Sequence, residues 1–316
     1  MFSSINRRKR RFVVKNKWLQ NSIVFLVALA ILATWSSTPA YAEKKTVKIA
    51  YEDWSSEIAS TNLVKAVIKE KLGHQCIIKR LSVTDQYVAV SNGSQDAIVG
   101  SWLPLQNSYY EKQKGQFVDL GPNLEGARTG LVVPVVSSTW LQAQDGQHTE
   151  PYMKIDSIEE IKDHYDEFQG KIIGIESDSG MMTIMREKLM PAYGLEDFEL
   201  VPGTEVSMTA ELAHAIQKRK WIVVLGWTPH WKFGRWALKF LDDPKNMWGD
   251  ESKIHTLVRK GLKEDMPDVY KFLDNFNWKP DDMERLLLWN QMGGNPYDNA
   301  KRWMRANPEV VKSWLK

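Results

Sequence analysis

Three tryptophans stand where short apolar segments of the chain end, and this shared position indicates a shared task. Each segment is apolar, with β-branched residues prominent, which is typical of a buried strand in a parallel sheet. The face of an indole ring attracts cations, and several such faces around a quaternary ammonium group form an aromatic cage. The sequence therefore predicts a cage for such a head, while packing of the same rings in an ordinary core stays open as the alternative. The candidate rings are Trp54, Trp102 and Trp227.

A second candidate feature is the segment 173–182, which reads as a strand, a short polar turn and the start of a helix. The first N–H groups of a helix lack partners within it and lie at the positive end of its dipole, so they bind carboxylates or phosphates. An ordinary loop capped by serine or aspartate would show the same pattern. Together with the cage, this turn favours a ligand that has a cationic head and a carboxylate tail.

The elements that must position these residues form two runs of alternating strands and helices, and this order predicts parallel sheets. Ligands of open α/β sheets bind just beyond the carboxyl ends of the strands, where the tryptophans and the polar turn are expected. The first run has expected strands at 44–51, 76–81 and 96–99, with helices at 55–72 and 85–92. The second has helices at 157–165, 180–189 and 209–218, with strands at 171–175, 198–201 and 221–225.

The fold class we predict is α/β with two lobes, each a mostly parallel sheet flanked by helices, and a ligand cleft between them. The chain crosses from one lobe to the other in the apolar segment 131–136, and 137–151 is predicted to be a polar surface loop. From residue 239 onward the pattern is mostly helical. The predicted boundaries are 43–133 for the first lobe, 134–235 for the second, and 236–316 for a helical return segment that completes the first.

Residues 1–42 have the pattern of a targeting segment. A basic stretch at 7–11 precedes thirteen apolar residues at 23–35, and 40–42 has the small-x-small form of a signal-peptidase site. Thirteen apolar residues are short for a bilayer span, which needs about 20, although an uncleaved anchor is the alternative. Residues 10–15 faintly resemble a twin-arginine signal. We expect export to the periplasm, cleavage after Ala42, and no lipid anchor because no cysteine lies near that site.

The net charge bears on nucleic-acid binding, and the cysteine content bears on disulfide formation. The leader holds seven Lys and Arg and no acid, so 35 basic and 39 acidic residues remain, a net charge of −4. No basic surface that would indicate nucleic-acid binding is left. Cys76 is the only cysteine, so no intramolecular disulfide can form, and its apolar surroundings predict an inert core residue.

An exported enzyme acting on a quaternary amine is the rival function. The six histidines show no H-E-x-x-H or similar metal spacing. Ser177 and Ser179 lack the G-x-S-x-G context of a nucleophile. We therefore predict no catalytic residue, no metal and no cofactor. A structural protein with a tryptophan-rich core is a third possibility, which predicts no rise in melting temperature on addition of a ligand.

Six segments in one order resemble the substrate-binding proteins of glycine betaine/proline betaine ABC transporters, which have the type II periplasmic binding protein fold. They are DWSSEIASTN at 53–62, SWLP at 101–104, GARTGLVVP at 126–134, MPAYGL at 190–195, WTPHW at 227–231 and IHTLVRKG at 254–261. They span nearly the whole chain after residue 42. The resemblance implies a monomeric solute receptor that closes around glycine betaine, proline betaine or a similar ligand. It would deliver the ligand to a membrane permease driven by an ATPase. A receptor specific for choline or carnitine is the alternative within the same family.

The resemblance also assigns roles to residues. The family's three-tryptophan prism falls on the three rings named above, and its backbone donors to the ligand carboxylate fall on Gly180 and Met181. Many relatives have Thr-His shortly after the Trp-Leu-Pro segment, where this chain has Gln106 and Asn107. The amide of Asn107 is expected to replace that histidine as a donor. His230 is a possible ligand contact, with a structural role favoured in which backbone satisfies a ring nitrogen.

Overall fold

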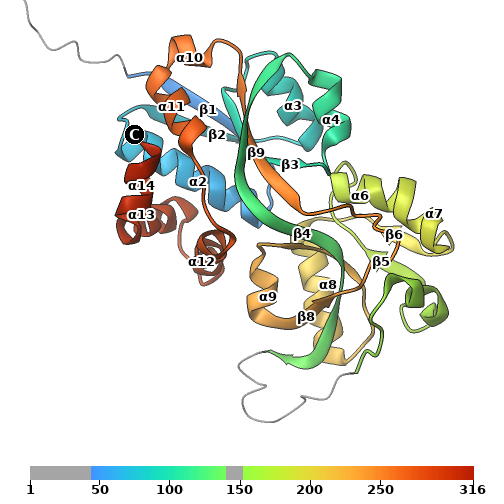
Figure 1. Cartoon of the computed structure of the whole chain (residues 1–316). Helices are drawn as coiled ribbons and strands as arrows, with labels where there is room; N and C mark the ends of the chain where they lie inside the picture. The colour runs from blue at the N-terminus through green and yellow to red at the C-terminus, as the bar shows by residue number, and fades with distance from the viewer. Residues whose placement is uncertain (1–43, 140–151) are drawn as a thin grey trace, which may run out of the picture. The chain divides into compact units, whose positions relative to one another are not determined.

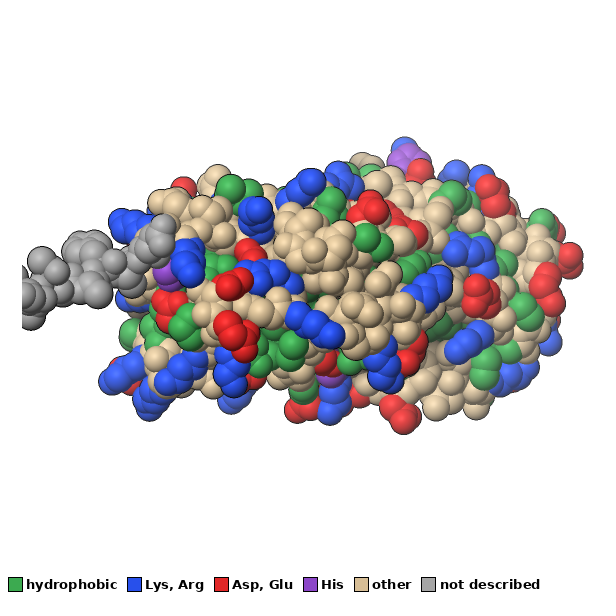
Figure 2. All heavy atoms as spheres, turned by 90° about the horizontal axis from the view of Figure 1, so that it is seen from above, with side chains coloured by type: hydrophobic (Ala, Val, Ile, Leu, Met, Phe, Trp, Pro, Cys, Tyr) green, Lys and Arg blue, Asp and Glu red, His purple; other side chains and the backbone are tan. Residues whose placement is uncertain are grey.

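The computed structural model of the protein describes residues 44–139 and 152–316 (Figure 1). The predicted signal peptide with its cleavage after Ala42, and most of the predicted loop at 137–151, lie outside the described residues. Among the described residues, no helix combines the length and the apolar character needed to cross a bilayer. Figure 2 shows acidic and basic side chains intermixed over one face of the molecule.

Sheet A begins with the predicted run of strands and helices. Strands β1 (Thr46–Tyr51), β2 (Gln75–Arg80) and β3 (Ala97–Leu103) pair in parallel, in the order β2-β1-β3. Helices α2 (Ser55–Glu70) and α3 (Val83–Ser91) connect them. This arrangement confirms the prediction for the first run of strands and helices, up to β3. Cys76 is buried in β2, where desolvation raises its pKa to about 12, so it is a core residue as expected.

The long strand β4 (Phe117–Thr139) runs through both sheets (Figure 1). Its first part pairs antiparallel with β9 (Ser252–Arg259) in sheet A. Its second part pairs antiparallel with β7 (Val224–Thr228) and β8 (Trp236–Phe240) in sheet B. The sequence predicted only a short crossover here and neither β8 nor β9. Repeated register shifts between β4 and β9 interrupt the alternation of apolar and polar residues that would reveal a strand.

Sheet B is completed by two short parallel strands and the helices around them. Strand β5 (Lys171–Ile173) pairs in parallel with both β6 (Glu199–Val201) and β7. Strand β7 is the strand predicted at 221–225, shifted by three residues. The helix predicted at 180–189 consists of an α-helical and a π-helical part, and the one predicted at 157–165 is a 3₁₀ helix. The elements are η1 (Ile158–His164), β5 (Lys171–Ile173), α6 (Gly180–Ile184), η2 (Met185–Leu189), α7 (Met190–Tyr193), β6 (Glu199–Val201) and α8 (Glu205–Lys218).

The C-terminal part is helical from Leu262 onward, as predicted, but β9 and the end of β8 occupy the start of the segment that was expected to be mostly helical. Proline stands in the first turn of four of its helices, where its missing N–H costs no hydrogen bond. Trp303 and Trp314 stack in parallel with ring centroids 5.8 Å apart, and both are buried. The remaining helices are α4 (Asn107–Gln113), α9 (Trp231–Arg235), α10 (Leu262–Asp265), α11 (Pro267–Asn275), α12 (Pro280–Gln291), α13 (Pro296–Ala306) and α14 (Pro308–Trp314).

The lobe boundaries remain a prediction, but the strand pairing shows where the chain changes from sheet A to sheet B. Within β4, residues 128–132 already pair with β7, so the change from sheet A to sheet B lies a few residues before the predicted boundary at 133. Strand β8 pairs only in sheet B, although 236–240 was assigned to the segment that returns to the first lobe. On this pairing, the second lobe extends at least to the end of β8.

Candidate ligand-binding site

The three predicted cage tryptophans line one narrow pocket. Trp54 is the N-cap residue of α2, Trp102 lies near the end of β3, and Trp227 lies near the end of β7. Each of the three side chains is buried, and each lines the pocket. The sheet A side also contributes Leu105 and Gln106, and the sheet B side contributes Thr129, Ile175, Ser179, Gly180 and Met181.

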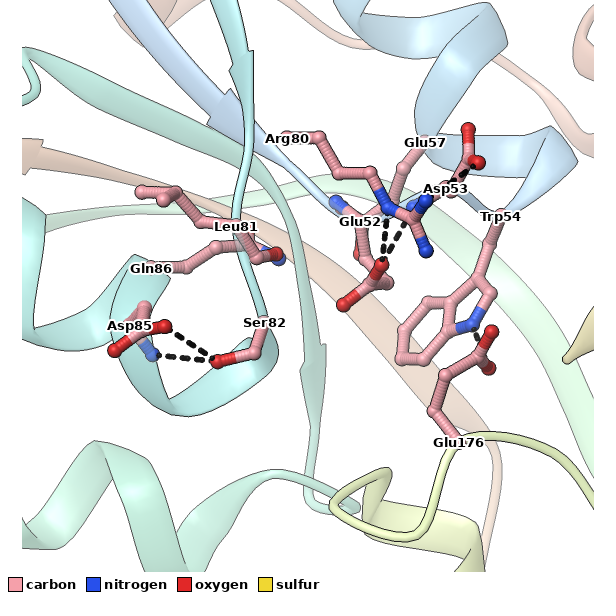
Figure 3. Close-up of polar contacts among 10 residues, drawn as sticks. All are labelled: Glu52, Asp53, Trp54, Glu57, Arg80, Leu81, Ser82, Asp85, Gln86 and Glu176. Atoms are coloured by element: carbon pink, nitrogen blue, oxygen red, sulfur yellow. Dashed lines mark hydrogen bonds and ion pairs between the residues drawn. The ribbon is translucent and has the colours of Figure 1, made fainter. Parts of the chain in front are cut away.

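Trp54 is held in place from the opposite side of the pocket. Its Nε1 donates a hydrogen bond of 2.6 Å to Oε2 of Glu176, which lies in the loop after β5 (Figure 3). Burial raises the pKa of the Glu176 carboxyl, and the carboxylates of Glu52 and Glu205 raise it further. A cation bound against the Trp54 ring would lower that pKa again, since an opposite charge favours the ionised form. The bond therefore links the two sides of the pocket, and the carboxylates around it favour a cation bound nearby.

Glu205 makes a second link between the two sides. Its Oε2 accepts the backbone N–H of Ser55 at 2.8 Å, and its Oε1 accepts Nε1–H of Trp231 at 3.1 Å. Ser55 is the first residue of α2, whose N-cap residue makes no side-chain cap. The carboxylate from α8 thus caps α2 from across the pocket, where the helix dipole favours a negative charge. Burial opposes this charge, but the His230 ring and the Ser55 hydrogen bond lower the pKa of Glu205 to about 2.

His230 stands behind Trp227 and does not line the pocket. Its Nδ1 accepts the backbone N–H of Lys232 at 3.0 Å, and its Nε2 lies 3.1 Å from Oε1 of Glu205. Burial, together with the neighbouring Lys232, lowers the pKa of His230 to about 4, so the ring is neutral at pH 7. The possible ligand contact is therefore not supported, and the favoured structural role, with backbone bonded to a ring nitrogen, fits the geometry.

Lys232 is fully buried against the Trp227 ring. Its Nζ lies 4.1 Å from the centre of the Trp227 ring, a cation–π contact, and 3.5 Å from the carbonyl oxygen of Leu225. Burial lowers the pKa of Lys232 to about 7, although Glu205 counteracts this effect. The burial of this residue was not predictable from the sequence, because lysine is rarely buried in full.

The predicted carboxylate seat lies at the start of α6. Ser179 caps the helix by accepting the N–H of Met182 at 3.3 Å. The N–H groups of Gly180 and Met181 bond to no other described residue, and both residues line the pocket. The structure thus places these two donors beside the three rings. Gly180 also packs against the backbone of Leu105 from the sheet A side, an approach that leaves no room for a Cβ atom.

The prediction for Asn107 is not supported by this geometry. Asn107 is the first residue of α4, its side chain is exposed, and it does not line the pocket. The preceding residue, Gln106, lines the pocket instead and is only 3% exposed. Neighbouring residues at a helix start point in different directions, so the residue that faces the pocket lies one position earlier than the family pattern suggests.

Glu57 is expected to make the stability of the protein depend on pH. This carboxyl is buried in α2, and its Oε2 accepts the N–H of Glu52 at 2.6 Å. Burial raises its pKa from 4.5 to about 8. The native protein therefore keeps a proton that the unfolded chain releases near pH 4.5, so the free energy of unfolding falls as the pH rises from 4.5 to 8. For one such group the fall amounts to a few kcal/mol.

Glu57→Gln is expected to remove this part of the pH dependence, because glutamine keeps the shape but does not titrate. Urea unfolding of both proteins at pH 5 and pH 8 measures the difference. The variant should resemble the wild type at pH 5 and be more stable than it at pH 8. An equal loss of stability in both proteins between the two pH values would show that Glu57 is not the group responsible.

Within 44–139 and 152–316, no group of three or more His, Cys, Asp or Glu residues is placed to hold a metal ion. The pocket's lining contains no ionisable side chain, so its polar groups are amides, hydroxyls and backbone N–H groups. Such a lining can bind and orient a small molecule. It offers no general acid or base in direct contact with one.

Comparison with known proteins agrees with this reading of the pocket. Over 155 residues, the chain is 42% identical to the glycine betaine/carnitine transport binding protein GbuC of Listeria monocytogenes. That match covers 48% of this chain and 51% of GbuC, so the chain spans about half the length of this curated relative.

Two solved structures extend the comparison. Lactococcal OpuAC, in its closed-liganded conformation with glycine betaine, is 37% identical with a TM-score of 0.77, covering 86% of this chain and 100% of that one. An ABC-transporter choline binding protein in complex with choline is 26% identical with a TM-score of 0.74, covering 85% and 91% of the two chains. Both support the predicted two-lobed fold.

The family match covers most of the described chain. Residues 45–306 match the OpuAC family, the substrate binding domain of the ABC-type glycine betaine transport system. This range includes both sheets, the three tryptophans and the start of α6. The chain belongs to the OpuAC family of substrate-binding domains of ABC-type glycine betaine transport systems.

Proposed function

We propose that the protein is an extracytoplasmic receptor for glycine betaine or a related quaternary ammonium compound, which it delivers to an ABC importer. The observation that carries this proposal is the convergence of Trp54, Trp102 and Trp227 with the free N–H groups of Gly180 and Met181 in one pocket. The three rings would enclose the methylated nitrogen. The two N–H groups would bind the carboxylate at the other end of the ligand.

Binding would proceed by closure of two lobes on the ligand through hinge motion. The bonds that cross the pocket are those that closure would form, namely Trp54 to Glu176, Ser55 to Glu205, and the Tyr109 hydroxyl to the carbonyl of Asp178 at 2.7 Å. The closed, loaded receptor would then dock on a membrane permease driven by an ATPase. We propose that it acts as a monomer.

The sequence supports two further parts of the proposal. The pattern of residues 1–42 favours export to the periplasm with cleavage after Ala42 and without a lipid anchor. The lack of ionisable groups in the pocket lining favours binding over catalysis, so we propose that the protein is not an enzyme.

A receptor for carnitine or choline is the second candidate. The relative GbuC is named for carnitine as well as glycine betaine, and the similar choline binding protein holds choline. The pocket would hold the head group of each of these molecules in the same way, so the polar end decides between them. The donors at the start of α6 favour a carboxylate, which glycine betaine and carnitine have and choline lacks.

Isothermal calorimetry of the purified protein with glycine betaine, proline betaine, carnitine and choline tests the proposal. We expect binding of at least one carboxylate-bearing compound to be tighter than that of choline. Absence of binding to all four, together with no rise in melting temperature on their addition, would reject the proposed function.

A further inference from the structure

Gln106 has one end of its amide fixed by buried donors. Its Oε1 accepts a hydrogen bond from the Tyr87 hydroxyl at 3.1 Å and from the backbone N–H of Trp102 at 3.2 Å. The Tyr87 oxygen lies 2.6 Å from Oγ of Ser101, which can in turn donate to it. All four residues are buried. Because both groups that face Oε1 are donors, the network decides which end of the amide is oxygen and which is nitrogen.

The other end of the amide is free. No residue in the described part of the chain accepts a hydrogen bond from Nε2 of Gln106. Although Gln106 as a whole is only 3% exposed, its Nε2 is not among the fully buried side-chain atoms that lack a partner, so this atom keeps some accessible surface. Since Gln106 lines the pocket, its small accessible surface opens into that pocket. Two N–H donors therefore face the ligand space, where leaving them unpaired costs free energy.

We propose that Nε2 of Gln106 donates a hydrogen bond to an acceptor oxygen at the polar end of the ligand, and so selects ligands that have a carboxylate over a bare quaternary ammonium ion. This inference rests on the proposed function and deepens it. No lining side chain is positively charged, so the carboxylate is held by neutral donors alone. The Gln106 amide acts from the sheet A side, opposite the backbone donors of Gly180 and Met181 on the sheet B side.

Two probes separate this role from that of the cage. Glycine betaine has both a quaternary head and a carboxylate, whereas tetramethylammonium has only the head. In Gln106→Leu, we expect glycine betaine to bind roughly 10- to 100-fold more weakly, the usual effect of losing a hydrogen bond to a charged group. Tetramethylammonium should bind within about 2-fold of the wild type, because the rings are unchanged. Asn107→Leu, the matched control one residue away, should change neither ligand by more than about 2-fold.

A second variant keeps the shape of the side chain and the acceptor for Tyr87. In Gln106→Glu, a protonated carboxyl at pH 5 can still donate to the ligand, whereas an ionised one at pH 8 repels it. The affinity for glycine betaine should therefore fall about 10-fold more between pH 5 and pH 8 in this variant than in the wild type. Tetramethylammonium should show no such fall. Thermal unfolding without ligand confirms that each variant is folded.

The outcomes are distinct. Equal weakening of both probes in Gln106→Leu, with no added pH dependence in Gln106→Glu, would mean that Gln106 only supports the Trp102 backbone, and would overturn the proposal. A large loss in Asn107→Leu would return the donor role to Asn107. If wild-type protein binds tetramethylammonium but the Gln106 variants bind glycine betaine normally, the cage stands and only this inference fails. If wild-type protein binds neither probe, the proposed function fails first.

Discussion

Gly180→Ala is expected to weaken glycine betaine binding by at least about 100-fold while leaving the unliganded protein folded. An added Cβ atom would lie 2.7 Å from the carbonyl carbon of Leu105 and closer still to its oxygen. Such atoms cannot approach within 3.0 Å, and the obstacle is backbone, which cannot rotate away. Because Leu105 comes from the sheet A side and Gly180 from the sheet B side, the methyl group would keep the two sides apart. Calorimetry with glycine betaine measures the loss.

Gly234→Ala is the matched control for this variant. An added Cβ atom there would meet only the end of the flexible Leu288 side chain, at 3.2 Å. Its binding of glycine betaine should remain within about 2-fold of the wild type, and its melting temperature should stay close as well. Wild-type affinity in Gly180→Ala would show that Gly180 and Leu105 do not approach each other in the bound protein, and would contradict the described geometry.

Trp227→Ala should weaken both glycine betaine and tetramethylammonium by on the order of 100-fold. A buried tryptophan at a binding site is typically worth a few kcal/mol when truncated, and part of this is the attraction of the ring face for the cation. Truncation would also remove the cation–π contact between this ring and Nζ of Lys232, 4.1 Å from its centre. Trp227→Phe keeps an aromatic face and should lose only about 3- to 10-fold.

Trp221→Ala serves as the control for removing a tryptophan. This residue precedes β7, packs against His164 and Phe168, and does not line the pocket. It should cost stability but leave the affinity for both probes within about 2-fold. If Trp227→Ala bound tetramethylammonium as tightly as the wild type, Trp227 would not belong to a cage.

The parts of the fold that follow simple periodic patterns were predictable from the sequence. The strands and helices of sheet A up to β3 have clear apolar segments with turn residues between them, and the structure confirms them. Strand β4 was missed because its first half contains Asp119, Gly121, Pro122 and Asn123, residues that strands usually avoid. It forms because β9 pairs along it from a distant part of the chain, a contact that no local pattern reveals.

The candidate site also has residues that local sequence patterns predict and residues that they do not. The tryptophans could be found because a large aromatic residue directly after an apolar segment is a local signal. The carboxylates that hold the two sides together, Glu176 and Glu205, could not be found, since a glutamate near a turn or a helix start is ordinarily solvated. The choice between Gln106 and Asn107 depends on which of two adjacent side chains turns inward where α4 begins. That orientation is set by Tyr87 and the Trp102 backbone, which the sequence alone does not place beside them.

The most direct test compares glycine betaine with its carbon isostere, in which a neutral carbon replaces the quaternary nitrogen. The two molecules have nearly the same shape and the same carboxylate, so hydrogen bonds and apolar contacts are matched and only the positive charge differs. If the three rings form a cation-binding cage, calorimetry should show glycine betaine binding at least about 30-fold more tightly, as several cation–π contacts would produce. Equal affinity for the two molecules would contradict the cage, because the pocket would then recognise shape and carboxylate without regard to charge.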